Sequence, residues 1–254
     1  ALTWRAGRGA ETHELYVGSA PDQLDLADTV TGAPYAAYDT SPLDLQLGQT
    51  YYWQVTEVNA AELPARWEGD IQAFTVRDFL VVDDFEAYTN DAETYSRVFQ
   101  TWIDGAGYTY PDEVPGNGTG SYMGHDPGSG DIMEKAIVHG GVQSAPIYYG
   151  NGGQSLSEVS RSFDEPQDWT RASAQTLSIA FHGAADNSGQ LYVKINNTRV
   201  NYDLDASHIA AEAWQIWNID LSTVNGSLQS VTKMTIGVDG GSGIVYVDDI
   251  YLYP

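Results

Sequence analysis

The later part of the chain repeats a two-residue period of apolar and polar positions. In four segments, residues 176–183, 190–196, 214–221 and 233–239, alternate positions carry large apolar side chains. Successive side chains of a β-strand point to opposite faces, so each segment is predicted to be a strand with one buried face. The predicted core residues are Leu177, Ile179, Phe181, Leu191, Val193, Ile195, Trp217, Ile219, Leu221, Met234, Ile236 and Val238.

More strands are expected around these four segments. They are residues 80–86, 135–141, 143–150, 157–163 and 244–252. About nine strands with one apolar face each predict two packed antiparallel sheets, a jelly roll. The one helical candidate is the Ala-rich segment 206–214, because Asp205 directly before it is a good N-cap.

The first 77 residues form a separate pattern of short alternations. Apolar alternation occurs at residues 2–4, 14–18, 51–58 and 71–76, and turn-rich segments separate these stretches. A small β-sandwich is expected there. A new strand with its own acidic cluster starts at residue 80, so we expect two domains, residues 1–77 and 80–254, in an all-β protein.

Charge narrows the range of partners. Eleven basic and thirty-five acidic residues give a formal net charge of −24, which repels nucleic acid and anionic membrane surfaces. No apolar run approaches the roughly 20 residues that span a bilayer, so membrane insertion is not expected. Neutral ligands and divalent cations are the expected partners.

Two acidic clusters lie at the ends of the later domain. "VVDDFE" spans residues 81–86 and "YVDDI" spans residues 246–250. Neighbouring strand residues face opposite sides, so one of Asp248 and Asp249 would face a buried layer. A bound cation is expected to neutralise it, assisted by a bulge that changes the side-chain parity between Val247 and Ile250. The first and last strands of a jelly roll are commonly neighbours, and converging carboxylates suit calcium. The alternative is that both pairs are solvated at strand ends.

These motifs resemble those of a known class of modules. Residues 80–254 are similar to the β-sandwich carbohydrate-binding modules found beside glycoside hydrolases, and to a LamG-like jelly-roll domain of large secreted bacterial proteins. The similarity is carried by Asp84-Phe85-Glu86, by Asp248-Asp249-Ile250 and by "WQIWNIDLS". It implies a structural calcium held by Asp84, Glu86, Asp248 and Asp249.

The first domain resembles a fibronectin type III domain. Trp4 on an early strand and "LGQTYYWQV" on a late one carry the resemblance, although the usual first strand and its proline are missing. Such modules are mostly spacers, so Trp4, Tyr51 and Trp53 are expected in its core. The chain is therefore expected to be a piece of a larger extracellular protein with other domains.

Sugar-binding sites combine aromatic platforms with a few polar side chains. The candidates outside the predicted core are Trp102, Tyr108, Tyr110, Tyr122, Tyr148, Tyr149, Trp169 and Trp214. Trp102, Tyr108 and Tyr110 surround a glycine turn in a long loop. A second candidate is the polar face of the central strands, where Ser178, His182, Tyr192 and Lys194 would line a groove. The alternative for many of these aromatics is half-buried packing.

Catalytic motifs are sparse. The sequence has no Glu-x-Asp-x-x-Glu, His-Glu-x-x-His or Gly-x-Ser-x-Gly motif and no phosphate loop. The expected function is therefore non-catalytic binding of a polysaccharide. The alternatives are an architectural or adhesion domain without a glycan ligand and, third, a polysaccharide lyase or glycoside hydrolase.

Overall fold

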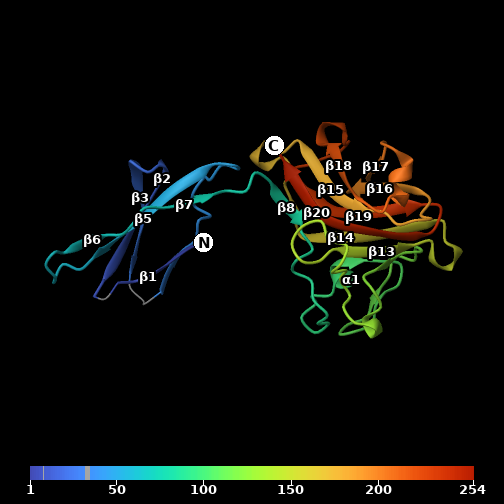
Figure 1. Cartoon of the computed structure of the whole chain (residues 1–254), viewed down its shortest axis with the longest axis horizontal. Coiled ribbons are helices and arrows are strands. Elements are labelled where there is room, and N and C mark those ends of the chain that lie inside the picture. The colour runs from blue at the N-terminus through green and yellow to red at the C-terminus, as the bar shows by residue number, and fades with distance from the viewer. Residues whose placement is uncertain (8, 32–34) are drawn as a thin grey trace. The chain divides into compact units, whose positions relative to one another are not determined.

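The structure is a computed structural model that describes residues 1–7, 9–31 and 35–254. Its secondary structure is almost entirely β, which confirms the predicted fold class (Figure 1). Within the described residues there is one α-helix, the single turn α1 (Val98–Thr101). The chain divides into two compact units, Ala1–Phe79 and Leu80–Pro254.

The first unit consists of two antiparallel layers. One sheet has the order β3-β2-β5-β6, with β7 also paired to β5, and the other pairs β1 with β4. Leu2 and Tyr38 from the smaller sheet pack against Leu15 and Val17 from the larger one. The strands are β1 (Leu2–Arg5), β2 (Thr12–Ala20), β3 (Gln23–Thr31), β4 (Tyr35–Tyr38), β5 (Thr50–Val58), β6 (Arg66–Glu68) and β7 (Gln72–Thr75).

The second unit is a sandwich of a six-stranded and a five-stranded antiparallel sheet. The six-stranded sheet has the order β12-β13-β20-β15-β18, with β8 paired to β20, and the five-stranded sheet has the order β17-β16-β19-β14-β9. The six-stranded sheet contains β8 (Leu80–Asp83), β12 (Tyr122–Met123), β13 (Ala145–Tyr149), β15 (Thr176–His182), β18 (Trp214–Asp220) and β20 (Gly243–Tyr253). The five-stranded sheet contains β9 (Trp102–Ile103), β14 (Leu156–Gln167), β16 (Gln190–Ile195), β17 (Thr198–Asn201) and β19 (Val231–Asp239). A separate hairpin pairs β10 (Gly107–Tyr108) with β11 (Val114–Pro115).

The core of the second unit follows the two-residue period. All twelve predicted core residues are buried in one cluster between the sheets. Two predicted elements are wrong. Segment 206–214 forms only a 3₁₀ turn at Ala206–Ala210, capped by Asp205, because Trp214 already begins β18. Segment 135–141 is not a strand, because the N–H groups of His139 and Gly140 donate to a carboxylate instead of to a neighbouring strand.

A buried carboxylate joins the two sheets. Asp83, at the end of β8, accepts hydrogen bonds from the indole of Trp102 on β9 (2.8 Å) and from the guanidinium of Arg161 on β14 (2.7 Å). It also accepts from the hydroxyl of Tyr88 (2.7 Å) and the N–H of Phe85 (3.0 Å). Four donors on one carboxylate satisfy a charge that would otherwise be costly to bury.

Replacement of Asp83 by alanine is expected to lower the free energy of unfolding of the second unit by about 3–5 kcal/mol, because Arg161, Trp102 and Tyr88 lose their shared acceptor inside the protein. Urea denaturation followed by tryptophan fluorescence measures this. Asp203→Ala, at an exposed position, is the matched control and should change the value by less than about 0.5 kcal/mol. Equal effects of the two substitutions would show that Asp83 does not join the sheets.

Candidate functional site

Aromatic side chains cross the outer face of the six-stranded sheet. Ile147, Val245 and Phe181 face the core, so their strand neighbours face outward. Register places Tyr122 opposite Tyr148, and it places His182 between Tyr246 and Trp214. We call this set the aromatic band: Tyr122, Tyr148, Tyr246, His182 and Trp214.

The aromatic band runs obliquely across the sheet and is partly accessible, because Tyr148 pairs with Ile244 on β20 and Tyr246 lies two residues further along that strand. The ring of His182 lies 5.4 Å from that of Trp214 and 5.9 Å from that of Tyr246, edge to face in both cases. Tyr122 is 50% exposed, and the other four side chains are half-buried. The band spans five strands, or about 19 Å at the usual strand spacing. Its rings are therefore held by packing while part of each remains open to solvent.

A polar chain adjoins the aromatic band at Tyr148. The Nδ1 atom of His125 is hydrogen-bonded to the Tyr148 hydroxyl (2.7 Å), and its Nε2 atom is hydrogen-bonded to Glu134 (3.1 Å). Glu134 is itself held by the N–H groups of Ala136 (2.5 Å) and Ile137 (3.3 Å). Burial, together with the charge of Glu134, raises the pKa of Tyr148, so its hydroxyl stays protonated and can both donate and accept.

A hollow of about 530 Å³ opens beside Tyr122 and Tyr148. Another side of the hollow is formed by the loop that follows β9, at Asp104, Ala106 and Gly107. The loop is fixed because the carboxylate of Asp104 accepts from the N–H groups of Ala106 (2.9 Å), Gly107 (2.8 Å) and Met123 (2.9 Å). Burial raises the pKa of Asp104 against the opposing effect of these three donors.

The acidic residues of the two ends contact one segment, residues 139–143. The carboxylate of Asp248 accepts from the N–H groups of His139 (3.0 Å) and Gly140 (3.2 Å). Glu86 accepts from the N–H groups of Val142 (3.0 Å) and Gln143 (3.2 Å). The expected convergence of the first and last strands is therefore present, because β8 pairs with β20.

The predicted bulge is also present. Ile179 pairs with Ile250 and Ala180 with Asp248, so Asp249 is the extra residue, with a left-handed φ of 46°. Val247 and Ile250 consequently both face the core, while Asp248 lies on the outer face of the sheet under segment 139–143. Asp248 is nevertheless fully buried.

Glycine permits the close contact between this segment and Glu86. Gly141 has φ of 66°, and a Cβ atom added there would lie 2.2 Å from the carboxylate of Glu86. Asp84 accepts from the N–H of Glu86 (3.3 Å). Asp249 pairs with His139 (2.6 Å) and accepts from the Tyr251 hydroxyl. In the described part of the chain, no three His, Cys, Asp or Glu side chains form a group that could hold a metal ion.

Burial, together with repulsion from the charge of Asp249, raises the pKa of Asp248 to about 7. Hydrogen bonds from three backbone N–H groups act in the opposite direction and lower the pKa. In the unfolded chain the value is 3.8, so the native state binds the extra proton. The stabilisation from Asp248 is therefore complete below about pH 4 and is lost as the pH rises to about 7.

In buffer containing EDTA, the unfolding free energy of the wild type should fall between pH 4 and 7 relative to that of Asp248→Asn, by about 4 kcal/mol at most. The asparagine keeps an acceptor for the same N–H groups but does not titrate. Denaturant titrations at several pH values measure the difference. Parallel curves for the two proteins would contradict a raised pKa at Asp248.

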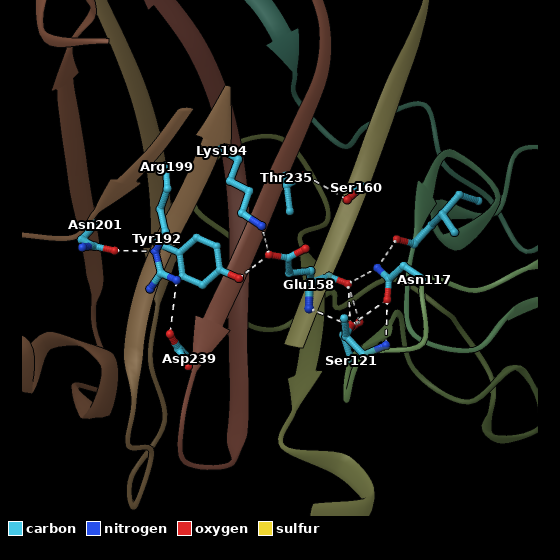
Figure 2. A network of polar contacts seen from close by, with 12 residues as sticks. Asn117, Ser121, Glu158, Ser160, Tyr192, Lys194, Arg199, Asn201, Thr235 and Asp239 are labelled. Carbon is cyan, nitrogen blue, oxygen red and sulfur yellow. Dashed lines mark hydrogen bonds and ion pairs between the residues drawn. The ribbon is translucent and has the colours of Figure 1, made fainter. Parts of the chain in front are cut away.

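Figure 2 shows a different arrangement on the outer face of the five-stranded sheet. Glu158 accepts hydrogen bonds from the Tyr192 hydroxyl (2.5 Å) and from the Lys194 ammonium. Burial tends to raise the pKa of Glu158, but these two donors outweigh it and hold the pKa below its usual range. The Arg199 guanidinium lies 3.6 Å from the centre of the Tyr192 ring and pairs with Asp239 (3.2 Å).

The ring of Tyr192 lies close to β19 at Gly237. A Cβ atom added to Gly237 would be 2.4 Å from the ring, so only glycine fits there. Tyr192 is fully buried beneath Arg199, and Lys194 is engaged with Glu158. The polar groups of this face are therefore largely occupied by one another.

The predicted groove of His182, Ser178, Tyr192 and Lys194 is wrong. His182 and Ser178 lie on β15 of the six-stranded sheet, whereas Tyr192 and Lys194 lie on β16 of the five-stranded sheet. All four face outward, and the two sheets have their outer faces on opposite sides of the sandwich. His182 belongs to the aromatic band. The predicted ligand-binding role of Tyr192 is wrong, because its side chain is fully buried.

The predicted ligand-binding role of Trp102 is also wrong. Its side chain is completely buried, it stacks near Phe85 (6.0 Å) and it donates to Asp83. Tyr108 lies half-buried on β10. Tyr110 is 54% exposed and its hydroxyl donates to Glu93 (2.8 Å). Neither tyrosine belongs to the aromatic band.

Tyr246, His125 and Glu134 were not among the residues predicted for the site. Tyr246 could have been found from the alternation in "GIVYVDDIYLY", because its side chain points to the face of β20 opposite to that of its buried neighbours Val245 and Val247. His125 and Glu134 lie outside the strands, on the turns after β12 and before β13, so no periodicity marks them.

No protein-family model and no curated protein matches the chain. Among solved structures, an exo-beta-agarase is 13% identical with a TM-score of 0.41, over 53% of this chain and 23% of that chain. A structure of carbohydrate-binding modules from the beta-sandwich super family is 12% identical with a TM-score of 0.41, over 94% of this chain and 85% of that one. The family 11 carbohydrate-binding module of a Clostridium thermocellum cellulase is 15% identical with a TM-score of 0.38, over 69% and 94%. Likenesses this distant carry no conclusion about function.

Proposed function

We propose that the second unit is a non-catalytic module that binds a polysaccharide along the aromatic band. The observation that carries this proposal is the oblique row of outward rings, one on each of five adjacent strands, with Tyr122 half exposed. Sugars present apolar C–H faces surrounded by hydroxyl groups, and aromatic rings flanked by polar side chains match both features. His125 and Glu134 supply such polar groups beside Tyr148.

Charge favours a neutral polysaccharide. Glu134 and Asp249 lie beside the aromatic band, at Tyr148 and at the His139–Trp214 contact, and the whole chain carries a formal charge of −24. Carboxylate or sulfate groups on a ligand would be repelled by this field. Uncharged hexose polymers meet no such penalty.

The hollow beside Tyr148 supports binding without chemistry. A lyase could use a hydrogen-bonded His and Tyr as base and acid, and His125 with Tyr148 has that arrangement. Burial raises the pKa of Tyr148, which keeps its hydroxyl protonated and fits the acid of such a pair. The adjacent hollow disfavours a lyase, because the described residues that line it include no Lys or Arg to neutralise a uronate carboxylate.

We place the module in an extracellular protein of several domains, with the first unit as a fibronectin type III-like spacer. The two-layered β architecture of residues 1–79 is compatible with that role. No helix in the described ranges has both the length and the apolar character to cross a membrane.

Replacement of Trp214 or Tyr246 by alanine is expected to weaken binding to a polysaccharide about tenfold or more. An aromatic contact contributes about 0.5–1.5 kcal/mol beyond its buried area, and 1.4 kcal/mol corresponds to tenfold. A glycan array with the wild type identifies the polysaccharide, and isothermal titration calorimetry measures the variants.

Trp67→Ala is the matched control, because Trp67 is an exposed tryptophan of the first unit. It should leave the affinity unchanged. Total absence of glycan binding by the wild type would favour an architectural domain. New reducing ends released from the bound polysaccharide would contradict the non-catalytic assignment.

A structural calcium at the edge formed by β8 and β20 is part of the proposal. Asp84, Glu86, Asp248 and Asp249 would hold it once their carboxylates move together, since no three of them form a metal-holding group as they lie, and oxygen ligands of this kind suit calcium. Support comes from the burial of Asp248 beside Asp249, since a cation would favour the ionised form that burial disfavours. Without a cation, N–H groups of segment 139–143 donate to the carboxylates of Asp248 and Glu86.

Calcium should raise the melting temperature at pH 7 above the value in EDTA. A ligand at 100 times its dissociation constant stabilises the native state by about 2.7 kcal/mol. This effect should increase with pH, because calcium requires ionised carboxylates, whereas the contribution of Asp248 alone decreases with pH. Asp249→Asn should reduce the shift. Identical melting in calcium and EDTA would rule the site out.

A further inference from the structure

The aromatic band has different surroundings at its two ends. At the β12 end, the hollow of about 530 Å³ lies between Tyr122 and the loop that begins at Asp104. This loop runs beside β12, since the N–H of Gly105 donates to the carbonyl of Ser121 (3.1 Å). At the β18 end, the ring of His139 contacts Trp214, and the outward side chains of Ile216 and Asn218 further along β18 are exposed. A chain lying along the band would therefore meet the loop at one end only.

The hollow also differs chemically from the rest of the aromatic band. Phe99 and Tyr122 provide apolar surface, while His125, Asp126 and Asn151 provide polar atoms within the same lining. A terminal sugar residue has one more free hydroxyl group than an internal residue, because one of its links is absent. A polar hollow accommodates that hydroxyl, whereas a ring platform alone gives it no partner.

We propose that this hollow binds the end of a neutral polysaccharide chain, so that the module recognises chain ends and the adjacent residues lie along the aromatic band. This inference rests on the proposed function, because it concerns the same band. The carboxylate of Asp104 accepts from three N–H donors, and both ring nitrogens of His125 are hydrogen-bonded, to Tyr148 and Glu134. The terminal hydroxyls therefore meet the amide of Asn151 and the carboxylate of Asp126, which can accept more than one hydrogen bond.

The decisive experiment varies the number of chain ends while the mass of polysaccharide stays constant. The probe is the soluble neutral polysaccharide that the glycan array identifies, before and after partial acid hydrolysis that raises its reducing ends about tenfold. Calorimetric titration of the wild type should show about tenfold more bound protein per gram after hydrolysis. An unchanged stoichiometry per gram would overturn recognition of chain ends while leaving polysaccharide binding intact. Absence of binding to every glycan would overturn both proposals.

A blocked hollow gives an independent test. Ala106 is exposed at its rim, so Ala106→Trp should fill it and lower the affinity for the hydrolysed polysaccharide at least tenfold. Ala87→Trp is the matched control, because Ala87 is exposed and lies outside the hollow and the aromatic band. Its affinity should equal that of the wild type. Equal affinities of the two variants, both with native melting temperatures, would contradict binding in the hollow.

Discussion

The second unit depends on the buried carboxylate of Asp83, which belongs to one sheet and receives donors from the other. Asp83 ends the edge strand β8 of the six-stranded sheet, and Trp102 and Arg161 belong to the five-stranded sheet. A charge in this position is stable only with all of its partners in place, so the sheets meet there in one arrangement. The loop that continues from β9 at Asp104 therefore starts from a fixed point. That loop reaches β12 and shapes the hollow beside Tyr122.

The two outer faces of the sandwich are used differently. On the five-stranded sheet, opposite charges are paired and Arg199 covers the ring of Tyr192, so aromatic surface is hidden (Figure 2). On the six-stranded sheet, edge-to-face contacts join the rings of Trp214, His182 and Tyr246, and each of these side chains remains partly exposed. The proposed binding of a sugar polymer rests on this difference rather than on the number of aromatic residues.

Segment 139–143 connects the acidic edge with the aromatic band. Its N–H groups hold Asp248 and Glu86, and the ring of His139 contacts Trp214 at 5.4 Å while pairing with Asp249. A cation at this edge would act on the same segment. The acidic edge and Trp214 of the aromatic band therefore contact the same segment.

Sequence alone determined the all-β class, the strands of the second unit with a strict two-residue period and the twelve core residues, and it indicated a bulge between Val247 and Ile250 that the structure places at Asp249. These follow from local rules, because side-chain parity and the cost of a buried charge can be evaluated within one strand. Tertiary structure alone decided which sheet each strand joins and what covers each outward side chain. Tyr192 and His182 have the same outward parity, but strand order places them on opposite faces, and Arg199 buries only the tyrosine. Trp102 was predicted in an exposed loop, but its indole is held in the core by a hydrogen bond to Asp83, nineteen positions earlier in the chain.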